Sequence, residues 1–115
     1  RSVYDGRYRY IVNLTPEATF QNVETKSPLF KEWKSLAKTD SHAKAMTTKY
    51  QHRPAIELYD VKNDPYCMKN LAEDAKQAST ISRLDKELKR WMKDCGDEGQ
   101  PTEMRAFEHM PGKRK

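Results

Sequence analysis

The chain has 115 residues, of which 36% are hydrophobic and 34% are charged, and its formal net charge is +5. This length corresponds to one domain or to part of one. The aromatic share of 10% excludes a wholly disordered chain. No apolar run approaches the ~20 residues of a membrane-spanning helix, and no segment reads as a secretory signal.

The positive charge is spread along the chain rather than gathered in one block. Lys and Arg alternate with Asp and Glu, which is typical of solvated helix faces, and the one clean basic run is 113–115. A surface that binds nucleic acid or a sulfated sugar is the other interpretation of this charge. The chain begins at Arg1 and enters a strand-like pattern at once, so we expect a piece of a longer protein.

The first fourteen residues have the pattern of a β-hairpin. Asp5 and Gly6 separate residues 2–4 from a strand over 7–14, and an Asp-Gly pair favours a type I′ turn with two positive φ angles. Apolar and polar residues alternate in the second strand, which predicts one core-facing row. That row is Tyr8, Tyr10 and Val12.

A helix is predicted after residue 27. Ser27 suits the N-cap and Pro28 the first helical position. Apolar residues then recur at helical spacing, which predicts a buried stripe. The stripe consists of Leu29, Phe30, Trp33, Leu36 and Ala37. Residues 39–51 are polar and weakly periodic, so we expect a loop with a short helical piece there.

A third strand is predicted over residues 55–61. The turn that follows contains Asp64 and Pro65, which suit the N-cap and first position of a short helix over 65–69. Asn70 can end that helix in a left-handed conformation.

The strongest helix signal lies over 77–94, and Gly96 follows as a stop. Its apolar face consists of Ile81, Leu84, Leu88, Trp91 and Met92. Together these elements predict an α+β fold, in which this long C-terminal amphipathic helix covers a small antiparallel sheet of about four strands. We expect a subdomain over 1–96 and a polar, basic tail over 97–115.

No pattern of catalytic or metal-binding residues stands out. Neither Cys67 nor Cys95 has a histidine close by in the sequence, and the three histidines show no metal-ligand spacing. Glu57 and Asp60 fall on opposite faces of their strand, which makes a poor carboxylate pair. We therefore predict no catalytic residue and no metal ligand, and the pairing of the two cysteines stays open.

Residues 53–72 resemble a segment near the C-terminus of the type I sulfatases. That segment reads Arg-Pro-x-Glu-Glu-Leu-Tyr-Asp-Leu, then Asp-Pro-x-Glu, then Asn-Leu-Ala. Here the three parts are Arg53-Pro54-Ala55-Ile56-Glu57-Leu58-Tyr59-Asp60-Val61, Asp64-Pro65-Tyr66-Cys67 and Asn70-Leu71-Ala72. The hairpin and the last helix are similar to the family's as well. Within the family, the residues at 27–30 and at 52–53 resemble heparan N-sulfatase and its bacterial relatives.

The resemblance implies that the parent protein is a sulfuric ester hydrolase, which uses formylglycine and Ca²⁺ to cleave sulfate esters or sulfamates, in particular those of sugars. The family makes formylglycine from a Cys/Ser-x-Pro/Ala-x-Arg motif in its N-terminal domain. Neither Cys67 nor Cys95 lies in such a motif. We therefore expect the C-terminal structural subdomain alone, without a cofactor and inactive by itself.

The resemblance also implies the partners and the compartment. The expected partners are the missing N-terminal catalytic domain and, for the parent, a sulfated carbohydrate; neither a membrane nor nucleic acid is expected. Family members are usually periplasmic, secreted or lysosomal, and we expect the same of the parent.

Two parts of the chain carry expectations of their own: the segment 39–54 and Cys67. The polar, basic segment 39–54 is the candidate rim of the substrate cleft, and His52 and Arg53 are its candidate contacts with a sulfated sugar. The alternative for Arg53 is a structural hydrogen bond or ion pair. Cys67 stands where the family has a Glu that completes a helix cap, so Cys67→Glu is expected to raise thermal stability.

Two functions of other classes stay open. The chain can be a free-standing basic module that binds nucleic acid or acidic glycans, or an interaction domain that docks through an apolar face. Binding that weakens steeply with salt would favour the basic module. A formylglycine motif upstream of Arg1 in the gene would favour the sulfatase.

Overall fold

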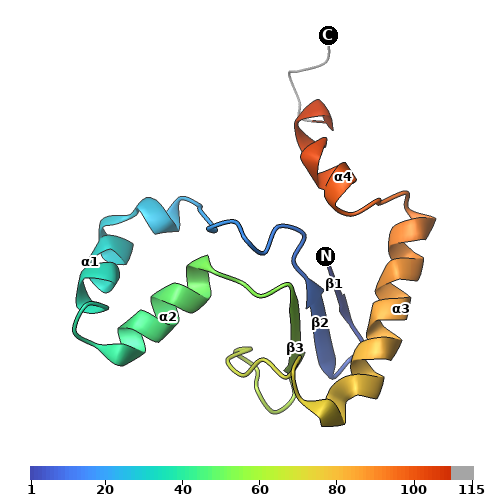
Figure 1. The fold of residues 1–115 in the computed structure, drawn as a ribbon, viewed down its shortest axis with the longest axis horizontal. Helices are drawn as coiled ribbons and strands as arrows, with labels where there is room; N and C mark the ends of the chain where they lie inside the picture. The colour runs from blue at the N-terminus through green and yellow to red at the C-terminus, as the bar shows by residue number, and fades with distance from the viewer. Residues whose placement is uncertain (110–115) are drawn as a thin grey trace. The chain divides into compact units, whose positions relative to one another are not determined.

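The computed structural model describes residues 1–109 of the chain, and Figure 1 shows their fold. These residues divide into two compact units: residues 1–14 with the chain from residue 55 onward, and Thr15–Pro54. The first unit contains the sheet and its covering helix, and the second contains two helices. Within the described residues, no helix is both long and apolar enough to cross a membrane.

The sheet of the first unit has three antiparallel strands in the order β1 (Ser2–Tyr4), β2 (Tyr8–Val12) and β3 (Ile56–Asp60). The α+β class and the antiparallel sheet are thus confirmed. The described residues contain three strands rather than the expected four or so.

The hairpin turn differs from the predicted type I′. Of its residues, only Gly6 has a positive φ, at 98°. The Asp5 carboxylate instead accepts hydrogen bonds from the backbone N–H groups of Arg7, at 2.9 Å, and Tyr8, at 2.7 Å. This side-chain turn makes the left-handed conformation unnecessary at Asp5, so glycine is required at only one position.

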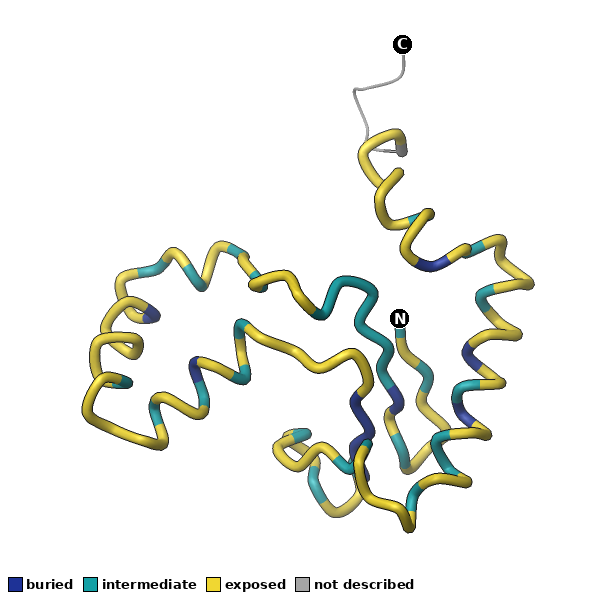
Figure 2. Tube along the Cα trace, viewed as in Figure 1, coloured by how far each residue is buried: buried dark blue, intermediate teal, exposed yellow. Residues whose placement is uncertain are grey.

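The core lies between the sheet and α3 (Ala78–Asp94), which follows the short η2 (Ala75–Gln77). Its fully buried side chains are at most 2% exposed: Tyr10, Leu58, Leu84 and Leu88. Figure 2 shows these buried stretches as dark blue segments of the strands and the helix. The predicted core row of β2 is confirmed, whereas Trp91, expected on the buried face of the helix, is 55% exposed.

The backbone at Gly96 explains why α3 ends there. Gly96 has φ of 72°, and the Asp97 N–H donates to the Met92 carbonyl at 2.8 Å while the Gly96 N–H donates to Lys93. This is a Schellman motif, which satisfies the last carbonyls of the helix.

Two further short elements follow α3, so it is not the last helix of the chain. These are α4 (Gln100–Met104) and η3 (Ala106–His109). The Arg1 guanidinium pairs with Asp97 and with Glu103, which ties this segment to the start of β1. Met110 and the basic run 113–115 lie outside the described residues.

The second unit consists of η1 (Glu24–Lys26), α1 (Pro28–Leu36) and α2 (Ser41–Gln51). The Ser27 side chain accepts from the Phe30 N–H at 3.2 Å, which confirms the predicted cap. The expected loop with a short helical piece over 39–51 is instead helical over most of its length. Asp40 caps an eleven-residue helix there by accepting from the Ala43 N–H at 2.7 Å.

The apolar stripe of α1 is only partly buried. Phe30 is 4% exposed, but Leu29, Trp33 and Leu36 are 54%, 49% and 53% exposed. The helical spacing was predicted correctly, but the burial of three of its residues was not.

Candidate functional site

An aromatic cluster in the second unit fixes the end of α2, next to the two candidate residues. Tyr50 packs against Phe30 with ring centroids 5.5 Å apart and meets Phe20 edge-on at 5.9 Å. The Asn22 amide donates to the Tyr50 hydroxyl at 3.0 Å, and the Phe20 N–H donates to the Gln51 carbonyl at 2.8 Å. These contacts join the segment before α1 to the last turn of α2. They therefore fix the backbone from which residues 52 and 53 extend.

His52 is the C-cap of α2 and is exposed. Its backbone N–H donates to the Thr48 carbonyl at 2.8 Å, and its φ of −122° and ψ of 113° take the chain out of the helix into an extended conformation. The helix end therefore determines the backbone here, and the imidazole is left at the surface.

Arg53 is also exposed, and it stacks on an aromatic ring. Its guanidinium carbon lies 4.1 Å from the centroid of the Phe20 ring, a close cation–π contact. Among the residues that the structure describes, no Asp or Glu pairs with Arg53. The stack holds the planar guanidinium while its N–H donors stay available for an anion such as a sulfate group.

His52 and Arg53 are neighbours in sequence, but the backbone does not direct them at one point. In an extended segment, successive side chains leave opposite sides of the chain. The observed feature is therefore an arginine stacked on Phe20, rather than a converging His–Arg pair.

The polar residues of the run 53–72 support the fold. The Asp60 carboxylate accepts from the Arg7 guanidinium at 2.8 Å and from the Asn63 amide at 2.8 Å. These contacts, the Arg7 hydrogen bond above all, lower the pKa of Asp60 to about 2. Asp60 thus links the turn of the hairpin to the turn after β3.

The short helix predicted over 65–69 is not formed. The Asp64 carboxylate accepts from the Met68 N–H at 3.0 Å and the Lys69 N–H at 2.8 Å, beyond the reach of a helix N-cap. Cys67, which precedes Met68 in this turn, has φ of 53°, in the left-handed region. Asp64 therefore closes a turn, and the capping argument for Cys67→Glu does not apply.

Asn70, expected to end that helix, instead binds the outer edge of β3. Its Oδ1 accepts from the Leu58 N–H at 2.9 Å, and its Nδ2 donates to the Ile56 carbonyl at 3.2 Å. Asp60, Asp64 and Asn70 thus each make backbone or ion-pair contacts within the fold.

Sequence reasoning missed the buried cluster that Glu57 and Tyr59 form on one face of β3. Glu57 is 8% and Tyr59 3% exposed, and the Tyr59 hydroxyl donates to the Glu57 carboxylate. The other carboxylate oxygen accepts from the Asn13 amide at 2.7 Å. Burial, together with Glu57, raises the pKa of Tyr59. Both Glu57 oxygens are engaged, which suits a structural role better than that of a general base.

The described residues do not fit a metal site of their own. Within residues 1–109, no three His, Cys, Asp or Glu side chains gather closely enough to hold an ion. The Ca²⁺ that the resemblance implies for the parent therefore has no such set of ligands among these residues.

Comparison with known proteins gives the family context. No family model matches the sequence. The chain is 32% identical over 107 residues to an ulvan-active sulfatase of Formosa agariphila, which covers 90% of this chain and 18% of that protein. It is 32% identical over 97 residues to a second ulvan-active sulfatase of that organism, covering 84% of this chain and 18% of that protein. The chain thus spans less than a fifth of the length of these relatives, and the resemblance to the sulfatases is confirmed over most of its own length.

Proposed function

We propose that this chain is the C-terminal structural subdomain of a sulfatase that hydrolyses sulfate esters or sulfamates, on sugars in particular. The similarity that covers 90% of the chain and 18% of its relative carries this proposal. The contacts of Asp60, Asp64 and Asn70 support it, because they give the family-like run a role in folding. The formylglycine and Ca²⁺ of the parent then belong to the rest of the protein.

The catalytic domain of the same protein is the proposed partner of this subdomain. Leu29, Trp33 and Leu36 form a half-exposed apolar stripe along α1, which is costly to leave in water. More than four-fifths of the length of the relatives lies outside the matched segment. We propose that this stripe packs on that remainder, with residues 1–96 as the subdomain and 97–115 as its tail.

His52 and Arg53 are proposed to border the substrate cleft of the parent. A guanidinium presents paired N–H donors that match the oxygens of a sulfate group, and the Phe20 stack at 4.1 Å limits the freedom that Arg53 loses on binding. The relatives are named for activity on ulvan. A sulfated carbohydrate is accordingly the proposed substrate class.

Hydrolysis of an aryl sulfate in the presence of Ca²⁺ tests the assignment. The full-length parent is expected to release sulfate, and the chain 1–115 alone is expected to release none. Sulfate release by the purified chain, freed of other sulfatases, would contradict the proposal that the catalytic groups lie outside residues 1–115. A parent without sulfatase activity toward aryl or carbohydrate sulfates would contradict the assignment itself.

A further inference from the structure

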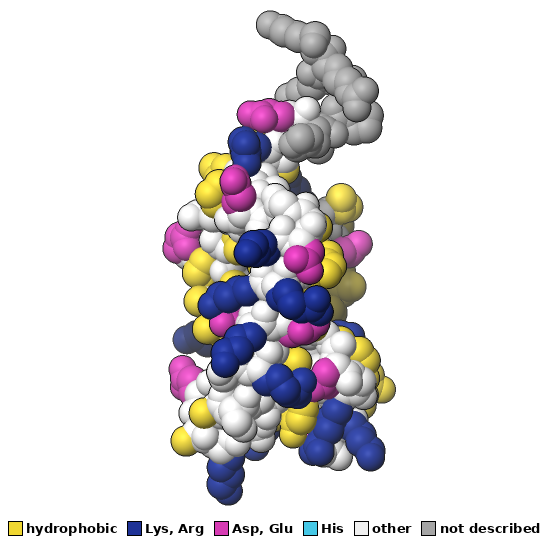
Figure 3. Space-filling view, turned by 90° about the vertical axis from the view of Figure 1, so that its right-hand side faces the viewer, with side chains coloured by type: hydrophobic (Ala, Val, Ile, Leu, Met, Phe, Trp, Pro, Cys, Tyr) yellow, Lys and Arg dark blue, Asp and Glu magenta, His cyan; other side chains and the backbone are white. Residues whose placement is uncertain are grey.

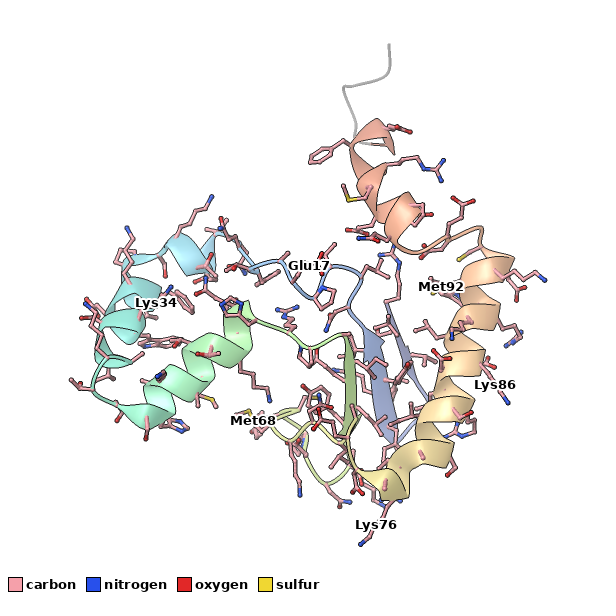
Figure 4. All side chains as sticks on the ribbon, viewed as in Figure 1. Glu17, Lys34, Met68, Lys76, Lys86 and Met92 are labelled. Atoms are coloured by element: carbon pink, nitrogen blue, oxygen red, sulfur yellow. The ribbon has the colours of Figure 1, made fainter. Side chains whose placement is uncertain are left out.

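Four basic side chains form a ridge on α3, directly opposite the face that packs on the sheet. Arg83, Lys86, Arg90 and Lys93 are separated by three, four and three residues, and all four are exposed. With 3.6 residues per turn and a rise of 1.5 Å, this spacing places them on one line about 15 Å long. In Figure 4, Lys86 points away from the sheet while Met92 lies on the side nearer to it.

The line itself carries no acidic residue, although acidic residues lie beside it. Glu87 pairs with Arg90, Asp94 lies 3.6 Å from the same guanidinium, and Asp5 of the hairpin turn pairs with Arg83. Within the described residues, Lys86 and Lys93 have no carboxylate partner. Figure 3 faces this side and shows Lys and Arg along the helix with Asp and Glu between them. The two ion pairs of Arg90 are exposed and contribute little, so an incoming anion can displace them.

The shape of this surface favours an extended ligand. The ridge is convex and follows a straight helix, so it offers no enclosed pocket for a small anion. A long polyanion can contact several of the cations at once, and each contact releases bound counterions. Arginine suits the paired oxygens of a sulfate group, and lysine adds a point charge.

We propose that the α3 ridge (Arg83, Lys86, Arg90 and Lys93) binds sulfated polysaccharide chains. The choice of a sulfated glycan over a nucleic acid rests on the proposed function, because a sulfatase meets sulfated polymers as substrates. The ridge would hold such a polymer by several weak, salt-sensitive contacts along its length.

Binding of dextran sulfate to the chain 1–115 tests the ridge. The double variant Lys86→Gln/Lys93→Gln should bind about tenfold more weakly, given up to about 1 kcal/mol for each exposed charge contact. The dependence of log affinity on log salt concentration should become shallower by about two, one for each lost contact. Both lysines are exposed, so thermal unfolding should show an unchanged fold.

The matched control is Lys62→Gln/Lys69→Gln, which removes the same charge from exposed positions elsewhere in the first unit. It should keep the affinity within about twofold, since it leaves the ridge contacts intact. An equal loss of affinity in the control variant would overturn the proposal, because net charge alone would then explain the binding. Duplex DNA bound as tightly, with the same sensitivity at Lys86 and Lys93, would overturn the choice of a sulfated glycan. Aryl sulfate hydrolysis by the parent does not need the ridge, so it reports on the proposed function separately.

Discussion

The side chain of Asn70 occupies the place of a neighbouring strand beside Leu58. Its Oδ1 accepts from the Leu58 N–H at 2.9 Å, and the Leu71 N–H donates to the Leu58 carbonyl at 2.8 Å. The outer edge of β3 is thereby satisfied without a further strand on that side. An edge strand otherwise presents unpaired backbone groups to other chains.

Replacing Asn70 should therefore destabilise the sheet. Asn70→Ala leaves the N–H of Leu58, a residue with 0% exposure, without its acceptor, and we expect a loss of about 1–3 kcal/mol in the free energy of unfolding. Urea unfolding of the chain 1–115 measures this. Asn70→Asp keeps an acceptor for Leu58 and should lose less. Equal losses in the two variants would show that the Oδ1 contact is not the source of the effect.

The sequence identified the elements whose signals are local and strong. The Ser27-Pro28 start of α1, the alternation around Tyr10 and the apolar face of α3 all depend on residues close together in the chain. The predicted elements form in the folded chain because the tertiary contacts favour the same local structure. The family-like run was recognised from its residues, whereas its contacts became clear only in the structure.

The errors arise where contacts with distant residues decide the outcome. Residues 41–51 have a weak apolar pattern, yet they are helical because Asp40 caps them and Tyr50 packs against Phe30. The Phe20 stack under Arg53 joins residues thirty-three positions apart, and no local pattern indicates it. The exposure of Trp33 could not be predicted either, because helical spacing identifies an apolar face but not what covers it.

Cys67 should be sensitive to the shape of the side chain rather than to its capping ability. At φ of 53°, a β-branched residue is strained and asparagine is tolerated. Cys67→Val should therefore be less stable than Cys67→Asn by about 1 kcal/mol, which thermal unfolding measures. Cys67→Glu should bring no gain, because no helix follows Asp64. A Glu variant that melts higher than the native chain would support a capping role after all.

Acid should weaken the fold through Asp5 and Asp60. The pKa of Asp5 is lowered from 3.8 to about 2, first by its bond to Arg83, and that of Asp60 is lowered equally, first by Arg7. A folded-state pKa below the unfolded value gives stability that is present above about pH 4 and is lost as the pH falls toward 2. Urea unfolding should show this decline.

The variant Asp60→Asn isolates the contribution of one carboxylate. It removes the ionised group, so its deficit against the native chain should be clear at pH 7 and should shrink as the pH approaches 2. Lys62→Gln serves as the control, because Lys62 is exposed and belongs to no ion pair within residues 1–109. A deficit that stays constant with pH would mean that Asp60 acts through its shape and neutral hydrogen bonds.

The stack of Arg53 on Phe20 should matter for the substrate of the parent enzyme. Replacing both His52 and Arg53 by Ala in the full-length protein is expected to raise the KM for a polysulfated carbohydrate and to leave kcat nearly unchanged, because binding is lost without a reacting group. Phe20→Leu should cause a smaller increase, since it keeps the apolar contact but removes the ring beneath the guanidinium. Arg53→Lys separates charge from planarity: it keeps the cation but loses the paired donors, so its KM should lie between those of the native enzyme and the double variant. If the double variant has the KM of the native enzyme, the stacked arginine serves the structure of the second unit and not the cleft.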